Sequence, residues 1–314
     1  MLKYAVLRVA QMVPVLVISS ILVFLLIHLI PGDPAAMLAG EDATDEDIRV
    51  IREQLNLNDP LPIQFIEWSV DVLQGDLGTS FRGGPGVRER ISLAAGPTLE
   101  LAFVAFAIAL SVGIPFGVMA GVRPGSIWDW GLSASTIVAI AIPNFVVGVL
   151  ALWLFGFKLG WLPIAGREPL WSDPVESLRH LVLPALTLGL TQAAILARFT
   201  RSAVAQVMGQ QYVTTARAKG LTERVVVSRH VLRNALISVI TVASLQVASL
   251  ITGSVVIERV FSRPGLGRLI VDAIQGRDVP VVQGMMLLLV TIFVLVNIVA
   301  DVLYGVVNPR IRHS

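Results

Sequence analysis

The sequence predicts an all-α integral membrane protein with six transmembrane helices and a small helical domain outside the membrane. Of its 314 residues, 55% are hydrophobic and only 15% are charged, and the mean hydropathy is +0.77. Soluble domains of this length carry more charge and fewer apolar residues. The charged residues are also gathered into a few segments, which separate long apolar runs.

Six apolar stretches are long enough to be spans, because a helix needs roughly 20 apolar residues to cross the ~30 Å hydrocarbon core. The first follows Lys3 and Arg8, as in a signal peptide. It is too long for the apolar part of one, and Pro31-Gly32-Asp33-Pro34 is a poor cleavage site, so we expect an uncleaved span. The predicted spans are residues 9–30, 98–121, 132–157, 180–199, 235–257 and 281–306.

The charge of the connecting segments predicts their side of the membrane. Residues 31–96 hold twelve acids and five arginines, a net charge of −7, whereas residues 198–233 hold seven cations and one acid, a net charge of +6. Because cytoplasmic loops carry an excess of Lys and Arg, 198–233 should be cytoplasmic and 31–96 external. The cations near both termini place these in the cytoplasm too. The weakly basic outer loop 258–280 departs from this rule.

Three parts follow from this topology. Residues 1–30 form the cytoplasmic N-terminus and first span, residues 31–96 an external helical cap, and residues 97–314 a five-span core with the cytoplasmic loop 198–233. We interpret the cap as a cover over the bundle or as a docking surface for substrate delivery.

Two short helices are expected in the cap. Thr44 and Asp47 have the spacing of a capping box, which predicts that a helix starts there. A second amphipathic helix should end at Gly75, and its apolar positions are Ile63, Ile66, Val70 and Leu73.

The spans themselves carry a few informative residues. Pro143 should kink the third span, and the Asn144 side chain could satisfy the carbonyl that the proline leaves free. The resulting bend either lines a translocation path or only adapts the helix to its packing neighbours. In the second span Gly113, Gly117 and Gly121 have the spacing that lets helices approach closely, within this chain or across a subunit interface.

The sequence excludes several classes of function. No cysteine is present, and no phosphate-binding loop G-x-x-x-x-G-K-[ST], so thiolate chemistry and ATP binding by this chain are not expected. No span holds paired acids, Ser with Lys or His, or H-E-x-x-H, which argues against a membrane enzyme. We predict an uncharged interior without a proton relay, which disfavours an ion-coupled carrier. Its polar residues are His28, Asn144, Gln192, Gln246, Asn297 and Asp301.

The basic segment has the pattern of a known motif, E-A-A-x-x-x-G followed by nine residues and I-x-L-P. Thr214-Thr215-Ala216 occupy the E-A-A places, Gly220 is the glycine, and residues 230–233 occupy the I-x-L-P places. The segment thereby resembles the inner-membrane permease subunits of bacterial ABC importers, although the first acid and the last proline are absent. The peptide-type branch departs from the motif in the same way.

Further stretches resemble the same branch in family order. They are residues 29–34, 75–80, 260–268 and 301–310, so the resemblance extends over the whole chain. The chain is similar to the B-type permease of dipeptide, oligopeptide and nickel importers. This implies a type I ABC importer permease fold in the bacterial inner membrane, and transport of peptides or, alternatively, of nickel chelates, glutathione or haem.

The resemblance also implies partners and sites. A second homologous permease would complete a heterodimer, two ATPase subunits would bind ATP-Mg, and an external solute-binding protein would deliver substrate. Membrane lipid surrounds the chain, and no nucleic acid, catalytic residue, bound cofactor or metal is expected. A short helix would dock in a groove of the ATPase, unless the segment is only a solvated basic loop held by anionic lipid. The residues implied for coupling are Thr215, Ala216, Arg217, Ala218, Lys219, Gly220 and Leu221, and the candidates for the translocation path are Pro143, Asn144, Gln192 and Gln246.

Overall fold

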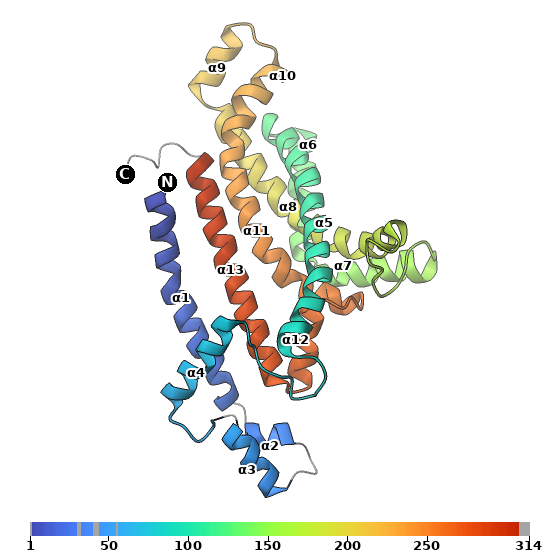
Figure 1. The fold of residues 1–314 in the computed structure, drawn as a ribbon. Coiled ribbons are helices and arrows are strands. Elements are labelled where there is room, and N and C mark those ends of the chain that lie inside the picture. Colours follow the sequence, from blue (N-terminus) through green and yellow to red (C-terminus); the bar gives the residue numbers. More distant parts are fainter. Residues whose placement is uncertain (1, 30–32, 40–43, 55, 308–314) are drawn as a thin grey trace.

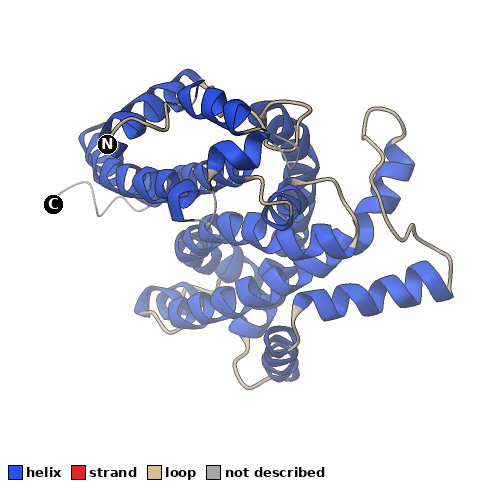
Figure 2. Cartoon of the chain, turned by 90° about the horizontal axis from the view of Figure 1, so that it is seen from below, coloured by secondary structure: helices blue, strands red, loops and turns tan. Residues whose placement is uncertain are grey.

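The computed structural model describes residues 2–29, 33–39, 44–54 and 56–307, and within these residues the chain forms helices and no strand (Figures 1 and 2). Five helices are long and apolar enough to cross a membrane, and a bent pair supplies a sixth crossing if it counts as one span. This confirms the predicted all-α membrane fold. The five long helices are α1 (Leu2–Leu29), α5 (Val87–Val122), α8 (Pro174–Met208), α11 (Leu232–Val260) and α13 (Val279–Val307).

Helices α5 and α8 pack closely against each other through the glycine stripe. A Cβ atom added at Gly113, Gly117 or Gly121 would lie 2.8, 2.5 or 2.7 Å from a backbone carbonyl oxygen of α8. Real Cβ atoms do not approach that closely, so only glycine permits this spacing. The prediction that the stripe packs helices together inside the chain is confirmed.

The main apolar core lies where α5, α8 and α11 meet. Its largest fully buried side chains are Leu101 from α5, Leu188 from α8, and Leu250 and Ile257 from α11. Burying a leucine-sized side chain stabilises a water-soluble protein by about 1.5–3 kcal/mol. In a bilayer the exposed alternative is also apolar, so close packing rather than removal from water holds the helices together.

The helix α1 lies at the edge of the bundle and is attached by polar contacts. The Gln283 side chain of α13 donates to the backbone carbonyl of Val23 at 3.0 Å. Arg8 pairs with Asp301 at 3.2 Å, so Asp301 joins two helices near their ends. Polar side chains can act as such interhelical links in a membrane.

The predicted third span is broken rather than kinked. It consists of α6 (Ile127–Ala141) followed by α7 (Asn144–Ala151) and the π-helix η1 (Leu152–Lys158), with an angle of 91° at the break. The residue before a proline avoids helical dihedrals, and Ile142 is extended, so Pro143 ends one helix and starts the next. The Asn144 side chain does not make the expected hydrogen bond to any described residue. In Figure 1, the α7–η1 segment extends sideways from the bundle.

The segment predicted to be external contains α2 (Pro34–Ala39), α3 (Asp45–Gln54) and α4 (Leu61–Gln74). The capping box before α3 forms as predicted, because the Thr44 amide donates to Asp47 at 2.9 Å and the Asp47 amide donates to Thr44 Oγ1 at 3.3 Å. Hydrogen bonds from Thr44 lower the pKa of Asp47 below its usual value. Helix α2 was not predicted, and the proposed boundary at residue 96 lies inside α5.

The second predicted cap helix, α4, ends at Gly75, whose φ is +83°. Its apolar stripe faces outward, however, because Ile63, Ile66, Val70 and Leu73 are all exposed. The packed face is aromatic instead. Rings from Phe65 and Trp68 contact Phe24 of α1 at centroid distances of 5.5 and 5.6 Å. The periodicity therefore identifies the helix but not the face that packs on the protein.

The α5–α8 spacing is testable with two substitutions in one helix. Gly117→Ala should destabilise the protein by about 1–3 kcal/mol, because the added methyl group overlaps the Ala197 carbonyl. Gly96→Ala is the control, since its Cβ meets nothing within 4 Å and alanine favours a helix interior by roughly 0.5–1 kcal/mol. Thermal unfolding of both purified variants would show the difference. Equal melting temperatures would contradict the close contact.

Candidate docking helix and polar clusters

The basic segment 198–233 is mostly helical. Helix α8 continues to Met208, and the π-helix η2 (Val226–Val231) leads directly into α11. Between them lie α9 (Gln211–Ala218) and the short α10 (Glu223–Val225). Figure 1 shows α9 and α10 beyond the end of the bundle at which α1 begins and α13 ends. The segment 209–222 therefore projects from two spanning helices that hold both of its ends.

Helix α9 rests on a small apolar core of its own. Val213 and Ala216 are buried, at 0% and 5% exposure, and they pack with Val204 of α8 and with Val226 and Val231 of η2. The small side chain of Ala216 is therefore used for packing inside this chain rather than offered to a partner. The exposed residues of the predicted coupling set are Thr215, Arg217, Ala218, Lys219, Gly220 and Leu221.

The end of α9 has the hydrogen bonds of a Schellman motif. The Gly220 amide donates to the carbonyl of Arg217 at 2.9 Å, and the Leu221 amide donates to that of Ala216 at 3.4 Å. Gly220 has a φ of +80°, the left-handed conformation predicted for it. An added Cβ there would meet nothing within 4 Å. Glycine is needed for its backbone angle and not for lack of space.

The two cations of this helix have different roles. Arg217 forms a two-pronged ion pair with Glu223, with Nε–Oε1 and Nη2–Oε2 distances of 2.6 and 3.3 Å. The pair ties α9 to α10 across the turn. The Lys219 side chain makes no hydrogen bond or ion pair to any described residue and is exposed. Of the two cations, Lys219 is thus the one available to a partner.

A hydrogen-bonded group that sequence reasoning missed fixes the start of α9. The Asn234 side chain donates to Tyr212 Oη at 2.7 Å and to the His230 carbonyl at 3.0 Å. Tyr212 Oη also donates to that carbonyl, at 3.4 Å. Because 22 residues separate Tyr212 from Asn234, nothing in the sequence shows that they touch.

The candidate pathway residues fall into two pairs. Gln192 and Gln246 are buried. The Gln246 side chain donates to the backbone carbonyl of Gln192 at 3.1 Å, which links α8 to α11. Gln246 Oε1 is buried without a hydrogen-bond partner among the described residues. Pro143 and Asn144 lie at the break between α6 and α7.

The prediction of an uncharged interior is wrong at the end opposite α9. Glu258 at the end of α11 is fully buried and accepts from Thr98 Oγ1 at 2.6 Å. It also accepts from the Gly267 amide at 2.8 Å. Its carboxylate therefore caps the start of α12 (Leu266–Gln275), where free amides and the helix dipole favour negative charge.

A second buried charge, Arg263, lies close by. It is 1% exposed and contacts Glu100 of α5 at 3.3 Å, and Glu100 also accepts from Arg167 Nε at 3.0 Å. Burial lowers the pKa of Arg263 from its usual value, while the nearby Glu100 carboxylate opposes that shift. A third, Asp278, accepts from Ser80 and from the Phe81 amide. These contacts join segments distant in sequence, so no local pattern reveals them.

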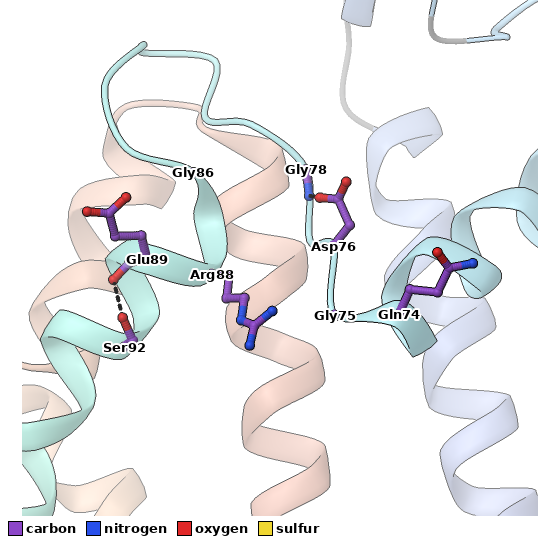
Figure 3. A pocket seen from close by; sticks show the side chains of 8 residues that line it. All are labelled: Gln74, Gly75, Asp76, Gly78, Gly86, Arg88, Glu89 and Ser92. Atoms are coloured by element: carbon purple, nitrogen blue, oxygen red, sulfur yellow. Dashed lines mark hydrogen bonds between the residues drawn. The ribbon is translucent and has the colours of Figure 1, made fainter.

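A cleft of about 680 Å³ lies at this same end, between the end of α4 and the start of α5, and Figure 3 shows the residues that line it. The Arg88 side chain extends across it towards Gly75, and Asp76 accepts from the Gly78 amide at 2.8 Å. All its lining residues are polar or glycine, namely Gln74, Gly75, Asp76, Gly78, Gly86, Arg88, Glu89 and Ser92. Such a lining suits a surface in contact with water.

Comparison with known proteins identifies the family. Residues 113–313 match the binding-protein-dependent transport system inner membrane component, and residues 1–83 match the N-terminal region of such membrane components. A candidate peptide transport system permease of Brucella abortus (strain 2308) is 45% identical over 307 residues, 98% of both chains. The glutathione transport system permease of Salmonella typhi is 42% identical over 314 residues, 100% of both chains.

The fold is shared with a solved transporter. A structure of the MetNI methionine ABC transporter in an inward-facing conformation matches with a TM-score of 0.59 and 22% identity, over 70% of this chain and 96% of that chain. The chain belongs to the family of binding-protein-dependent transport system inner membrane components. It is a multi-pass membrane permease and a transport component rather than an enzyme, as predicted.

The conformation of Gly220 gives a test of the docking helix. Gly220→Val should strain the left-handed turn by roughly 1–2 kcal/mol, whereas Gly220→Asn should be tolerated because Asn adopts this conformation more readily. Amide hydrogen exchange at residues 220 and 221 should become about 5- to 30-fold faster in the valine variant alone. Equal exchange in the two variants would show that the turn does not depend on the backbone angle of residue 220.

Proposed function

We propose that this permease translocates peptides and that α9 couples it to a cytoplasmic ATPase. One observation carries the proposal: the exposed face of α9 projects beyond the bundle while its buried face is fixed to both α8 and α11. A short helix offered in this way suits docking in a groove of a partner. The extended similarity to peptide and glutathione permeases supports the transport role.

Coupling would proceed through the two helices that hold α9. Movement of an ATPase on binding or hydrolysing ATP-Mg would displace α9, and α8 and α11 would follow because the cluster around Val213 and Ala216 joins them. The spans would then alternate between openings to the two sides, a two-state change driven by differential binding of the partner. The proposed contact surface consists of Ala218, Lys219 and Leu221. Arg217 holds this surface in position through its ion pair with Glu223.

The proposal includes orientation and assembly. The net charges of 198–233 and 31–96 support an orientation with α9 and both termini in the cytoplasm and the α4–α5 cleft outside. A solute-binding protein would deliver substrate to the external face formed by 31–96 and 258–280. A second, homologous permease would complete the path as a heterodimer, with the break at Pro143 and Asn144 as its candidate lining. Gln192 and Gln246 fit better as a link between α8 and α11.

Coupling is tested by charge changes on α9 in the assembled transporter. Lys219→Glu should lower both peptide uptake and substrate-stimulated ATP hydrolysis at least fivefold, the effect of about 1 kcal/mol at the contact. Arg217→Glu should impair both as well, because it places two carboxylates together. The double exchange Arg217→Glu with Glu223→Arg should restore activity, since it rebuilds the internal pair.

Arg224→Gln is the matched control, because Arg224 is an exposed cation of the same segment outside α9. Normal uptake in Lys219→Glu would contradict docking through this helix. A double exchange as inactive as the single change would show instead that Arg217 contacts the ATPase directly.

Substrate class is tested by competition in reconstituted transporter. Uptake of a labelled dipeptide should be saturable and inhibited by unlabelled peptides. Glutathione, itself a tripeptide, is the second candidate because of the full-length similarity to a glutathione permease. Nickel chelates and haem should not compete. Uptake that only nickel or haem inhibits would refute the peptide assignment while leaving the coupling proposal intact.

A further inference from the structure

A cavity of about 360 Å³ lies between α6 and α8, apart from the residues used above for coupling and translocation. Helix α6 contributes apolar and hydroxyl side chains, and α8 contributes one hydroxyl and two arginines. Its lining residues are Leu132, Ser133, Thr136 and Ile137 from α6, and Arg198, Arg201 and Ser202 from α8.

The two arginines of this cavity differ in their partners. Arg201 forms a two-pronged pair with Asp129, with both N–O distances at 2.8 Å, so its charge is compensated and α6 is fixed to α8. The Arg198 side chain is exposed and makes no hydrogen bond or ion pair to any described residue. The Ser133 and Ser202 hydroxyls also have no hydrogen bond within the described part of the chain. The cavity therefore offers one uncompensated guanidinium and two free hydroxyls, which suits an anion with several oxygens.

The position of the cavity along the bundle is that of a membrane boundary. Arg198 lies ten residues before the end of α8, about 15 Å at 1.5 Å per residue, and α8 leads into the projecting α9. At the start of α6, Trp128 and Trp130 are 51% and 73% exposed. Exposed tryptophans are enriched at the level of lipid headgroups. The cavity thus lies close to the headgroups on the α9 side.

The surface next to the cavity is apolar. Ile137, Val138 and Ile140 of α6 are 68%, 55% and 53% exposed, and they lead from the cavity towards the middle of the bundle. A free phosphate ion would gain nothing from this surface, and neither would a hydrophilic peptide. A phospholipid would place its phosphate in the cavity and its acyl chains along these side chains.

We propose that this cavity binds the phosphate of an anionic phospholipid from the cytoplasmic leaflet. Arg198 provides the charge, the Ser133 and Ser202 hydroxyls add hydrogen bonds, and Arg201 with Asp129 positions the two helices. Basic pockets between spanning helices on the cytoplasmic side are suited to such headgroups. The inference rests on the proposed orientation of the chain but not on its substrate or on coupling to an ATPase.

The test is native mass spectrometry of the purified full chain, titrated with phosphatidylglycerol, phosphatidylcholine or inorganic phosphate. Phosphatidylglycerol should be retained and phosphatidylcholine should bind more weakly. Arg198→Gln should weaken binding of phosphatidylglycerol about fivefold, the contribution expected of one cation near anionic lipid. Arg198→Lys should retain most of the affinity. An unchanged melting temperature in both variants would show that the fold is intact.

Arg224→Gln is the control for nonspecific attraction, because it removes one exposed cation from the same segment outside the cavity. If Arg224→Gln weakened phosphatidylglycerol binding as much as Arg198→Gln does, the proposal would be overturned. Displacement of the lipid by millimolar inorganic phosphate or by a dipeptide would also overturn it. Orientation is checked separately, with reporter fusions after Asp59 and Thr222 that should report opposite sides. Lipid binding in detergent does not depend on the orientation of the chain. A wrong orientation can therefore be distinguished from the absence of a lipid site.

Discussion

The close contact of α5 with α8 sets the positions of both ends of the molecule. At one end, α5 carries Thr98 and Glu100 into the buried clusters around α12. At the other, α8 carries Val204 into the core beneath α9. The carbonyl oxygens of α8 approach three glycines of α5 so closely that the two helices have little freedom to slide. The separation between the two ends of the bundle is therefore fixed by three glycines, which have no side chain to keep the helices apart.

Within the described residues, the buried charges lie towards the two ends of the bundle. Glu258 caps α12, Asp129 pairs with Arg201 at the start of α6, and the middle of the bundle is held by apolar packing and by amides such as Gln246. A charge is expensive in hydrocarbon, but much less so where helix ends and water are near. The buried charges thus link connecting segments to the helices they adjoin.

Local features of the fold were predictable from sequence, and distant contacts were not. Apolar run length predicts the spans, the Thr44 and Asp47 spacing predicts a helix start, and Gly220 predicts a left-handed turn, because each depends on a few neighbouring residues. The burial of Ala216 depends on η2, and the capping of α12 depends on Thr98, 160 residues away from Glu258. Proline predicts an interruption at residue 143, but neighbouring packing decides whether it becomes a kink or a 91° turn.

The anchoring of α9 has a mechanical consequence. Only Gly209 and Gln210 separate it from α8, and on the other side η2 runs into α11 without a break. The Val213 and Ala216 cluster, the Tyr212–Asn234 bond and the Arg217–Glu223 pair brace it from three directions. Helix α9 therefore has little freedom to move relative to α8 and η2. Because α9 packs against both α8 and η2, a displacement of α9 would be transmitted to two spanning helices at once.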